Sequence, residues 1–136
     1  MKILLIGLVV FLSFNCSHKL SPDYSWQNRR WILIELKEVP VQLSGSRRDA
    51  YIEFFPDEKK FTGVGGCNTI NGIYIINRKK TEIDFSHIAS TKMSCPDLAF
   101  ENTFLETLDK VNHYEVSGNT ILLKNHDDVL LIMKEQ

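Results

Sequence analysis

Residues 60–76 read KFTGVGGCNTINGIYII, and this stretch is the most informative part of the sequence about the fold. Its first part, residues 60–64, and its last part, residues 72–76, are rich in the β-branched and aromatic residues that favour strands. Between them, Gly65 and Gly66 allow a tight bend or a bulge, as at the corner of a β-barrel. The stretch therefore predicts two short strands with a glycine-rich bend between them.

Similar strand-like segments lie on both sides of this stretch. Residues 81–85 alternate between apolar and polar, so Ile83 and Phe85 should face a core. Turn signals such as Pro56-Asp57 separate the segments. The expected strands are residues 30–36, 51–55, 60–64, 72–76, 81–85, 113–116, 120–124 and 129–133. About eight short antiparallel strands at this spacing predict a small, mainly β sandwich or barrel.

One segment, residues 96–111, has a helical pattern instead. The apolar residues that recur there at helical spacing are Phe100, Phe104, Leu105, Leu108 and Val111. Ser94 can cap the start of this helix, Pro96 suits its first turn, and Asp97 favours the positive end of the helix dipole. We expect one helix, packed against the barrel so that it covers the open end.

The N-terminus has the layout of a secretory signal. Lys2 precedes an apolar run over residues 3–14, which is the arrangement typical of an exported protein. A membrane-spanning helix needs about 20 apolar residues, so this run is too short for a permanent span. A buried N-terminal strand or helix is the alternative, but a polar stretch follows at residues 15–27. We expect residues 1–15 to be the signal peptide.

Cys16 comes directly after the apolar run, and residues 12–16 resemble a bacterial lipobox. In that motif the cysteine is acylated, for example with palmitate, and becomes the first mature residue. Two or more acyl chains hold a protein firmly on a membrane, whereas one binds only marginally. Ser17-His18 follows without an aspartate, which by analogy with lipoprotein sorting indicates the outer membrane, facing the periplasm. Residues 16–29 would then be the lipidated cysteine with a flexible leash.

The chain contains three cysteines, an odd number that is unusual for an exported protein. If Cys16 carries lipid, Cys67 and Cys95 remain, and an oxidising periplasm permits their pairing. Such a bridge would stabilise the fold by about 3–4 kcal/mol in the chain-entropy model. Two buried free thiols are the alternative, because sequence alone does not show whether the two Cα atoms come close enough.

The composition and motifs argue against several classes of site. A formal net charge of -1 lacks the basic excess of nucleic-acid-binding proteins. Residues 63–66 are glycine-rich, but a strand rather than a helix follows, so they are no phosphate-binding loop. The four histidines have no metal-ligand spacing, alone or with the cysteines, and we expect no metal or cofactor. A nucleophilic pair of Cys95 with His87 stays open, without a local signature that supports it.

Two segments, read together, resemble the META domain family, the HslJ-like proteins. The first is residues 61–74, with Gly-Cys-Asn followed by Asn-Gly-x-Tyr, and the second is residues 88–96, with Ala-Ser-Thr-x-Met-x-Cys. The family motif residues present are Gly66, Cys67, Asn68, Thr91, Met93 and Cys95. The resemblance covers nearly the whole mature part, which we assign to one domain over residues 30–136. It implies a lipocalin-like β-barrel with a packed helix, in bacterial envelope proteins that are often lipoproteins and have no established enzymatic activity.

The resemblance and the anchor together suggest a non-enzymatic envelope lipoprotein that supports envelope integrity or stress tolerance by binding an envelope protein. The motif residues then form a structural knot rather than a reaction centre. A second hypothesis is a barrel that binds a lipid or another apolar ligand, in a cavity lined by residues such as Phe54, Tyr74 and Phe104. A cysteine-dependent enzyme is the third.

Overall fold

The computed structural model describes residues 25–136, so the predicted signal peptide and Cys16 lie outside the described residues. The elements, in chain order, are the 3-10 helix η1 (Ser25–Asn28), the strands β1 (Arg30–Leu36), β2 (Val39–Pro40), β3 (Tyr51–Phe55), β4 (Lys60–Val64), β5 (Thr69–Asn77) and β6 (Glu82–Ser90), the helix α1 (Leu98–Leu108), and the strands β7 (His113–Ser117), β8 (Thr120–Asn125) and β9 (Asp128–Glu135). The predicted mainly β fold with one packed α-helix is confirmed for this part of the chain.

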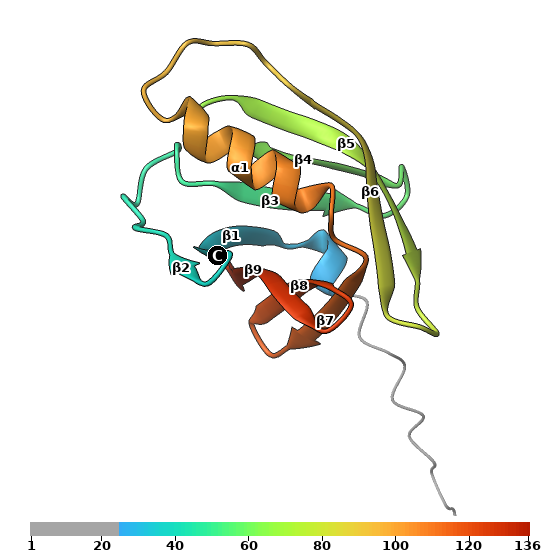
Figure 1. Ribbon diagram of the computed structural model, residues 1–136. Coiled ribbons are helices and arrows are strands. Elements are labelled where there is room, and N and C mark those ends of the chain that lie inside the picture. The colour runs from blue at the N-terminus through green and yellow to red at the C-terminus, as the bar shows by residue number, and fades with distance from the viewer. Residues whose placement is uncertain (1–24) are drawn as a thin grey trace, which may run out of the picture.

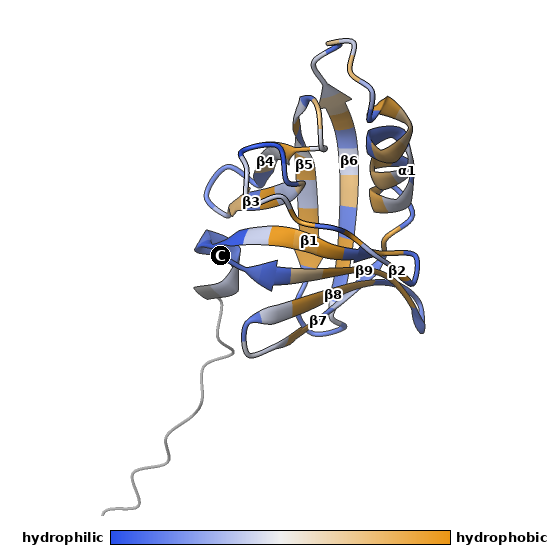
Figure 2. Cartoon of the chain, turned by 90° about the vertical axis from the view of Figure 1, so that its left-hand side faces the viewer, coloured by the Kyte–Doolittle hydropathy of each residue, from blue (hydrophilic) through white to orange (hydrophobic). Residues whose placement is uncertain are grey.

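The strands form one antiparallel sheet that closes on itself. Its order is β2-β1-β3-β4-β5-β6-β7-β8-β9, and β1 also pairs with β9, which completes the ring (Figure 1). The seam between β6 and β7 is the weakest, with one residue pair, Glu82↔His113. The connection from β6 to β7 contains α1, which lies on the other side of β1 from β7–β9 in Figures 1 and 2.

Aromatic side chains fill the interior of the ring. The ring centroids of Trp26 and Phe54 are 5.2 Å apart, and those of Phe54 and Tyr74 are 5.0 Å apart, both edge to face. Phe54, Tyr74 and Phe104 are at most 3% exposed, so they do not border a cavity that holds solvent. The hypothesis that these three side chains line a hollow interior is therefore wrong, because Phe54 and Tyr74 pack against each other and all three belong to the buried core.

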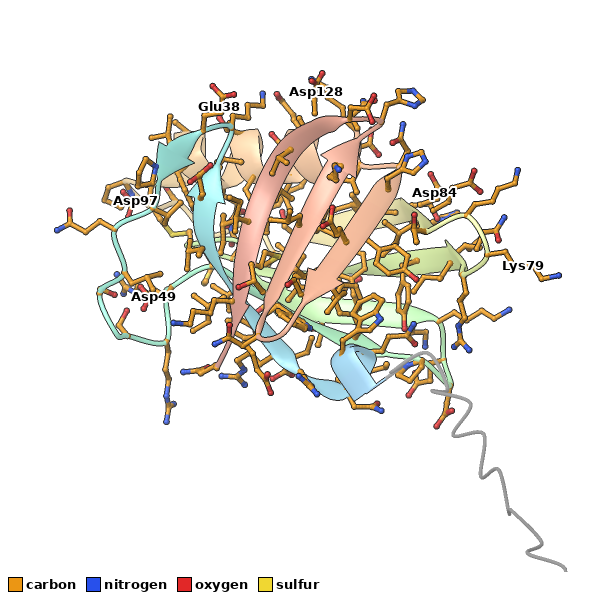
Figure 3. All side chains as sticks on the ribbon, turned by 90° about the horizontal axis from the view of Figure 1, so that it is seen from below. Glu38, Asp49, Lys79, Asp84, Asp97 and Asp128 are labelled. Atoms are coloured by element: carbon orange, nitrogen blue, oxygen red, sulfur yellow. A yellow bond between two sulfur atoms is a disulfide. The ribbon has the colours of Figure 1, made fainter. Side chains whose placement is uncertain are left out.

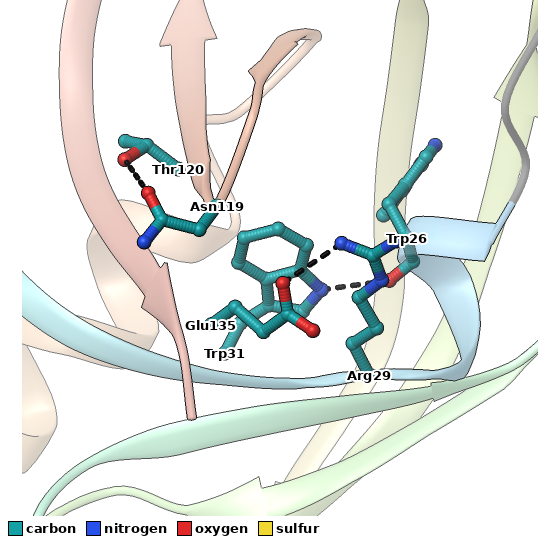
Figure 4. Close-up of polar contacts among 6 residues, drawn as sticks. All are labelled: Trp26, Arg29, Trp31, Asn119, Thr120 and Glu135. Carbon is teal, nitrogen blue, oxygen red and sulfur yellow. Dashed lines mark hydrogen bonds and ion pairs between the residues drawn. The ribbon is translucent and has the colours of Figure 1, made fainter.

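The folded domain begins earlier than the predicted boundary at Arg30. Residues 25–28, assigned above to the leash, form η1, and Trp26 is only 4% exposed. The backbone carbonyl of Trp26 accepts a 2.8 Å hydrogen bond from the indole Nε1 of Trp31 (Figure 4). Nearby, Arg29 and Glu135 form a 2.8 Å ion pair between the start of β1 and the end of β9. These contacts hold η1 against the seam that closes the ring.

Several other boundaries differ from the prediction. The helix spans Leu98–Leu108 instead of residues 96–111, and Asp97 is its N-cap residue, without a side-chain capping hydrogen bond. Ser94 therefore does not cap the helix. Strands β5 and β6 are longer than expected, and β2 is a ninth strand that was not predicted. Figure 2 shows the apolar stretch of β1, in orange, between α1 above it and strands β7–β9 below it.

Candidate functional site

The predicted motif residues meet around the side chain of Asn68, which is 1% exposed. Its Oδ1 accepts hydrogen bonds from Thr91 Oγ1 at 3.0 Å and from the backbone N–H of Met93 at 2.7 Å. Its Nδ2 donates to Glu101 Oε1 at 2.8 Å. One amide side chain thus connects the turn after β4, the segment before α1, and α1 itself.

Glu101, a residue that the sequence interpretation did not single out, completes this arrangement. Its carboxylate is 1% exposed, and Oε2 accepts the backbone N–H groups of Asn68 at 2.6 Å and Cys67 at 3.2 Å. Glu101 lies three residues before Phe104 and seven before Leu108, so it shares the buried face of α1 with them. A buried carboxylate costs free energy unless its oxygens accept hydrogen bonds, and here three donors meet it.

The two glycines of the turn allow Glu101 to approach the backbone. A Cβ atom on Gly65 would lie 2.7 Å from Glu101 Cγ, which is closer than real Cβ atoms come to another carbon. Gly66 has a φ of +115°, a conformation that side chains rarely adopt. The predicted glycine bend exists, and its cause is this close contact with the helix.

A disulfide between Cys67 and Cys95 ties the same two segments, with Cα atoms 6.2 Å apart. The structure therefore joins the two cysteines that the sequence left as a candidate pair. It also removes the thiol that a nucleophilic Cys95 would need. Thr91 contributes a second link, because its backbone N–H donates to Thr69 O at 3.0 Å. Met93 takes part only through its backbone in these contacts, and its side chain is 55% exposed. We call the family motif residues together with Glu101 the knot, and its members are Gly66, Cys67, Asn68, Thr91, Met93, Cys95 and Glu101.

A groove of about 770 Å³ lies beside the knot, between α1 and the hairpin of β1 and β2 with the loop that follows it. Leu36 and Phe100 contribute apolar surface to it, and Val39 on its border is 64% exposed. Its lining residues are Leu36, Lys37, Val39, Pro40, Val41, Gln42, Ser44, Ser46, Arg48, Asp49, Ala50, Gly66, Asp97, Ala99, Phe100 and Thr103. Figure 3 shows Asp49 and Asp97 on the same side of the molecule. The apolar groove thus lies outside the ring of strands, not within it.

The rim of the groove is an organised loop. Asp49 accepts hydrogen bonds from the backbone N–H groups of Ser44 at 2.8 Å and Gly45 at 2.7 Å. These bonds, the one from Ser44 first among them, hold the pKa of Asp49 below its usual value. Lys37 and Arg48 add positive charge to the same border. The groove therefore combines apolar walls with a polar, hydrogen-bonded mouth.

Two other depressions occur in the described part of the chain. One, of about 490 Å³, has both polar and apolar walls and includes His113 and His126, whose ring centroids are 5.7 Å apart. The other, of about 630 Å³, lies on the outer face of β8 and β9. Within residues 25–136, no group of three or more His, Cys, Asp or Glu side chains is arranged to hold a metal ion. No helix there has the length and apolarity that crossing a bilayer requires.

Comparisons with known proteins agree on the fold. The model of the META domain family matches residues 24–136. An NMR structure of a protein from Burkholderia xenovorans is similar, with a TM-score of 0.65 and 16% identity over 81% of this chain and 83% of the other. The crystal structure of a DUF4847 family protein from Bacteroides vulgatus has a TM-score of 0.59 and 17% identity, over 80% and 92% of the two chains. No curated protein matches the sequence.

Proposed function

Because the chain belongs to the META domain family, we propose that it is a lipoprotein of the bacterial cell envelope that acts by binding rather than by catalysis. In this proposal Cys16 carries the lipid and holds the domain on the outer membrane, facing the periplasm. The domain then supports envelope integrity or stress tolerance by binding another envelope protein. The groove beside α1 is the surface for that partner.

The groove is the observation that carries this proposal. Monomeric proteins rarely leave connected apolar surface open to water, and where they do it often marks a binding site. Here Val39 is 64% exposed and Leu43, in the loop that borders the groove, is 43% exposed. Polar groups around an apolar floor are typical of a protein interface, in which the centre is desolvated and the rim stays wet.

The knot supports the proposal because it holds one wall of the groove in place. It fixes the start of α1 to the turn after β4 through the disulfide and the three hydrogen bonds of Glu101. Gly66 belongs both to this turn and to the lining of the groove. A wall that is held in place before binding loses less conformational entropy when a partner docks. The structural role of the motif residues is therefore to pre-organise a binding surface.

A matched pair of substitutions tests the groove in the bacterium that carries the chain. Val39 and Ile75 are similarly exposed, at 64% and 59%, but Ile75 lies in β5, outside the groove. A deletion strain complemented with Val39→Asp should stay sensitive to heat and novobiocin, whereas Ile75→Asp should restore tolerance. The proposal fails if the deletion strain grows like the parent under heat and novobiocin, or if both variants fully restore its tolerance.

The anchor has a separate test. Mass spectrometry of the mature protein from membranes should find an acylated Cys16 at the N-terminus, and Cys16→Ser should release the domain from the membrane fraction. An unmodified Cys16 would overturn the anchor and leave the proposal for the groove intact.

The second candidate is that the same groove holds a lipid or another apolar small molecule. The volume of about 770 Å³ and the apolar walls favour it, since ligand sites are mostly apolar with a few polar groups at fixed places. Native mass spectrometry of the full-length chain should then show a bound species that Ala99→Trp, which fills the groove, displaces. A spectrum with only the unliganded chain would exclude this candidate.

A further inference from the structure

A shallow depression of about 630 Å³ lies on the outer face of β8 and β9, next to the end of β1. Its lining residues are Glu35, Lys37, Glu38, Leu122, Asp127, Asp128, Val129, Leu130 and Ile132. We call its four apolar members, Leu122, Val129, Leu130 and Ile132, the outer patch.

The strand pattern shows that the centre of the outer patch faces away from the core. Leu122 and Ile132 pair directly across β8 and β9. The residues before and after each of them are 0% exposed, and these are Ile121, Leu123, Leu131 and Met133. Because side chains alternate along a strand, Leu122 and Ile132 point to the outside of the ring. An antiparallel sheet usually has polar side chains on such a face, so two apolar ones side by side depart from the pattern.

Acidic side chains border the outer patch, three of them at one end. Glu38 lies in the turn between β1 and β2, and Asp127 lies in the turn between β8 and β9. Asp128 begins β9, and Glu35 in β1 lies opposite Ile132. Figure 3 shows Glu38 and Asp128 near each other at the ends of these strands. None of the four carboxylates forms an ion pair with another residue in the described part of the chain. Lys37 is the single basic side chain that lines the depression.

We propose that the outer patch is a docking surface for a basic amphipathic segment of another protein. The apolar side chains of the segment would cover Leu122 and Ile132, and its lysines or arginines would lie against Glu38 and Asp128. Four carboxylates against one ammonium group give the depression a negative potential, which favours a positively charged partner. This surface is separate from the groove of the proposed function, with Lys37 alone bordering both, and the inference does not depend on that function.

The same charges argue against two other occupants. A membrane surface with anionic lipids would be repelled by the acidic end of the patch. A second copy of the chain that docks by this patch would bring a second acidic border with it, and like charges in contact weaken association. A basic segment is the occupant whose charge complements the surface.

Fluorescence anisotropy with the full-length chain in an uncharged detergent tests the inference. The probe is a short fluorescein-labelled peptide in which leucine and lysine alternate, and the comparison is the peptide with glutamate in place of lysine. We expect the lysine peptide to bind at least tenfold more tightly, and its affinity to fall as salt is added. Glu38→Lys and Asp128→Lys should each weaken its binding about threefold to tenfold, since each replaces an attraction with a repulsion.

Two control variants separate the outer patch from general effects. Glu106→Lys changes the net charge equally at an exposed position on α1, and Ile75→Ser removes an exposed apolar side chain from β5. Both should bind the lysine peptide like the unchanged chain, while Leu122→Ser should bind it less well. Equal affinity for the two peptides, or an equal loss in Glu106→Lys, would overturn the inference. Binding to vesicles of anionic lipid that Glu38→Lys abolishes would also overturn it. The same holds for self-association that Glu38→Lys abolishes. If Leu122→Ser does not fold, the two exposed charge reversals still decide the outcome.

Discussion

Replacement of Glu101 by glutamine is the sharpest test of the knot. The shape of the side chain is kept, but one carboxylate oxygen becomes an NH₂ group. In the structure Oε2 accepts two backbone N–H groups and Oε1 accepts the amide of Asn68. In Glu101→Gln the remaining oxygen can serve the backbone donors, but the new NH₂ group then faces the NH₂ group of Asn68. One hydrogen bond is lost, and the other two lose their charge.

The expected cost follows from these three contacts. A hydrogen bond to a charged group contributes about 1.5–3 kcal/mol, and a neutral one about 0.5–1.5 kcal/mol. Taken at the lower end of both ranges, Glu101→Gln should therefore lower the free energy of unfolding by about 3.5 kcal/mol. Glu101→Ala should cost more, because it leaves buried donors without any acceptor. Glu106→Gln, at an exposed position of the same helix, should change stability by less than about 0.5 kcal/mol.

Urea unfolding of the full-length chain, followed by tryptophan fluorescence, measures these differences. With a slope of about 2 kcal/mol per molar urea, the midpoint of Glu101→Gln should fall by about 1.7 M with an unchanged slope. The groove should also lose affinity, since α1 forms one of its walls. If Glu101→Gln unfolds at the same midpoint as Glu106→Gln, the carboxylate does not hold the knot, and the structural account of the motif is refuted.

Three further predictions follow from the same structure. Replacement of Cys67 and Cys95 by serine should lower stability by about 2–4 kcal/mol in thermal unfolding, and a reductant should have the same effect on the unchanged chain but none on the variant. Gly65→Ala should destabilise by more than about 2 kcal/mol in urea, because its Cβ would meet Glu101 Cγ at 2.7 Å, and an unchanged midpoint would contradict this contact. Burial raises the pKa of Tyr74 to about 12, so the folded state keeps the hydroxyl neutral while the unfolded chain ionises near pH 10. The free energy of unfolding is therefore unaffected below pH 10 and falls as the pH rises from about 10 to 12. Tyr74→Phe, which removes a buried hydroxyl without a partner among the described residues, should be as stable as the unchanged chain at neutral pH and should unfold less readily between pH 10 and 12.

The local pattern of the sequence was sufficient for most of the ring. Strands such as residues 51–55 and 60–64 were predicted with the observed bounds, because side chains alternate there and turn residues end each segment. What the pattern missed depends on distant partners. The two residues of β2 have no period of their own and exist as a strand through pairing with Glu35 and Leu36. Trp26 stands in a polar stretch, and only its contacts with Phe54 and Tyr114 show that it belongs to the core.

The candidate site was predicted in some of its members but not in its arrangement. The motif residues were known from the family resemblance, and the odd cysteine count pointed to the pair Cys67 and Cys95. The role of Glu101 depends on where α1 lies against the turn after β4, which local patterns do not encode. The same holds for the groove, because its walls come from β1, β2 and α1, which are far apart in the chain. The filled interior follows from the size of the aromatic side chains that the ring of strands encloses.

The pairing of β1 with β9 also determines when the domain can fold. One edge of β1 pairs with β2 and β3, but its other edge finds a partner only in the last strand, with Trp31 opposite Glu135. Contacts between distant parts of a chain form slowly, because a long loop must close before they stabilise anything. If the chain leaves a membrane channel with its N-terminus first, β1 and its neighbours wait with an open edge until the final residues arrive. An open edge is prone to pairing with other chains. Transfer and folding would then end together, and a chaperone that shields β1 in the meantime would raise the yield of folded protein.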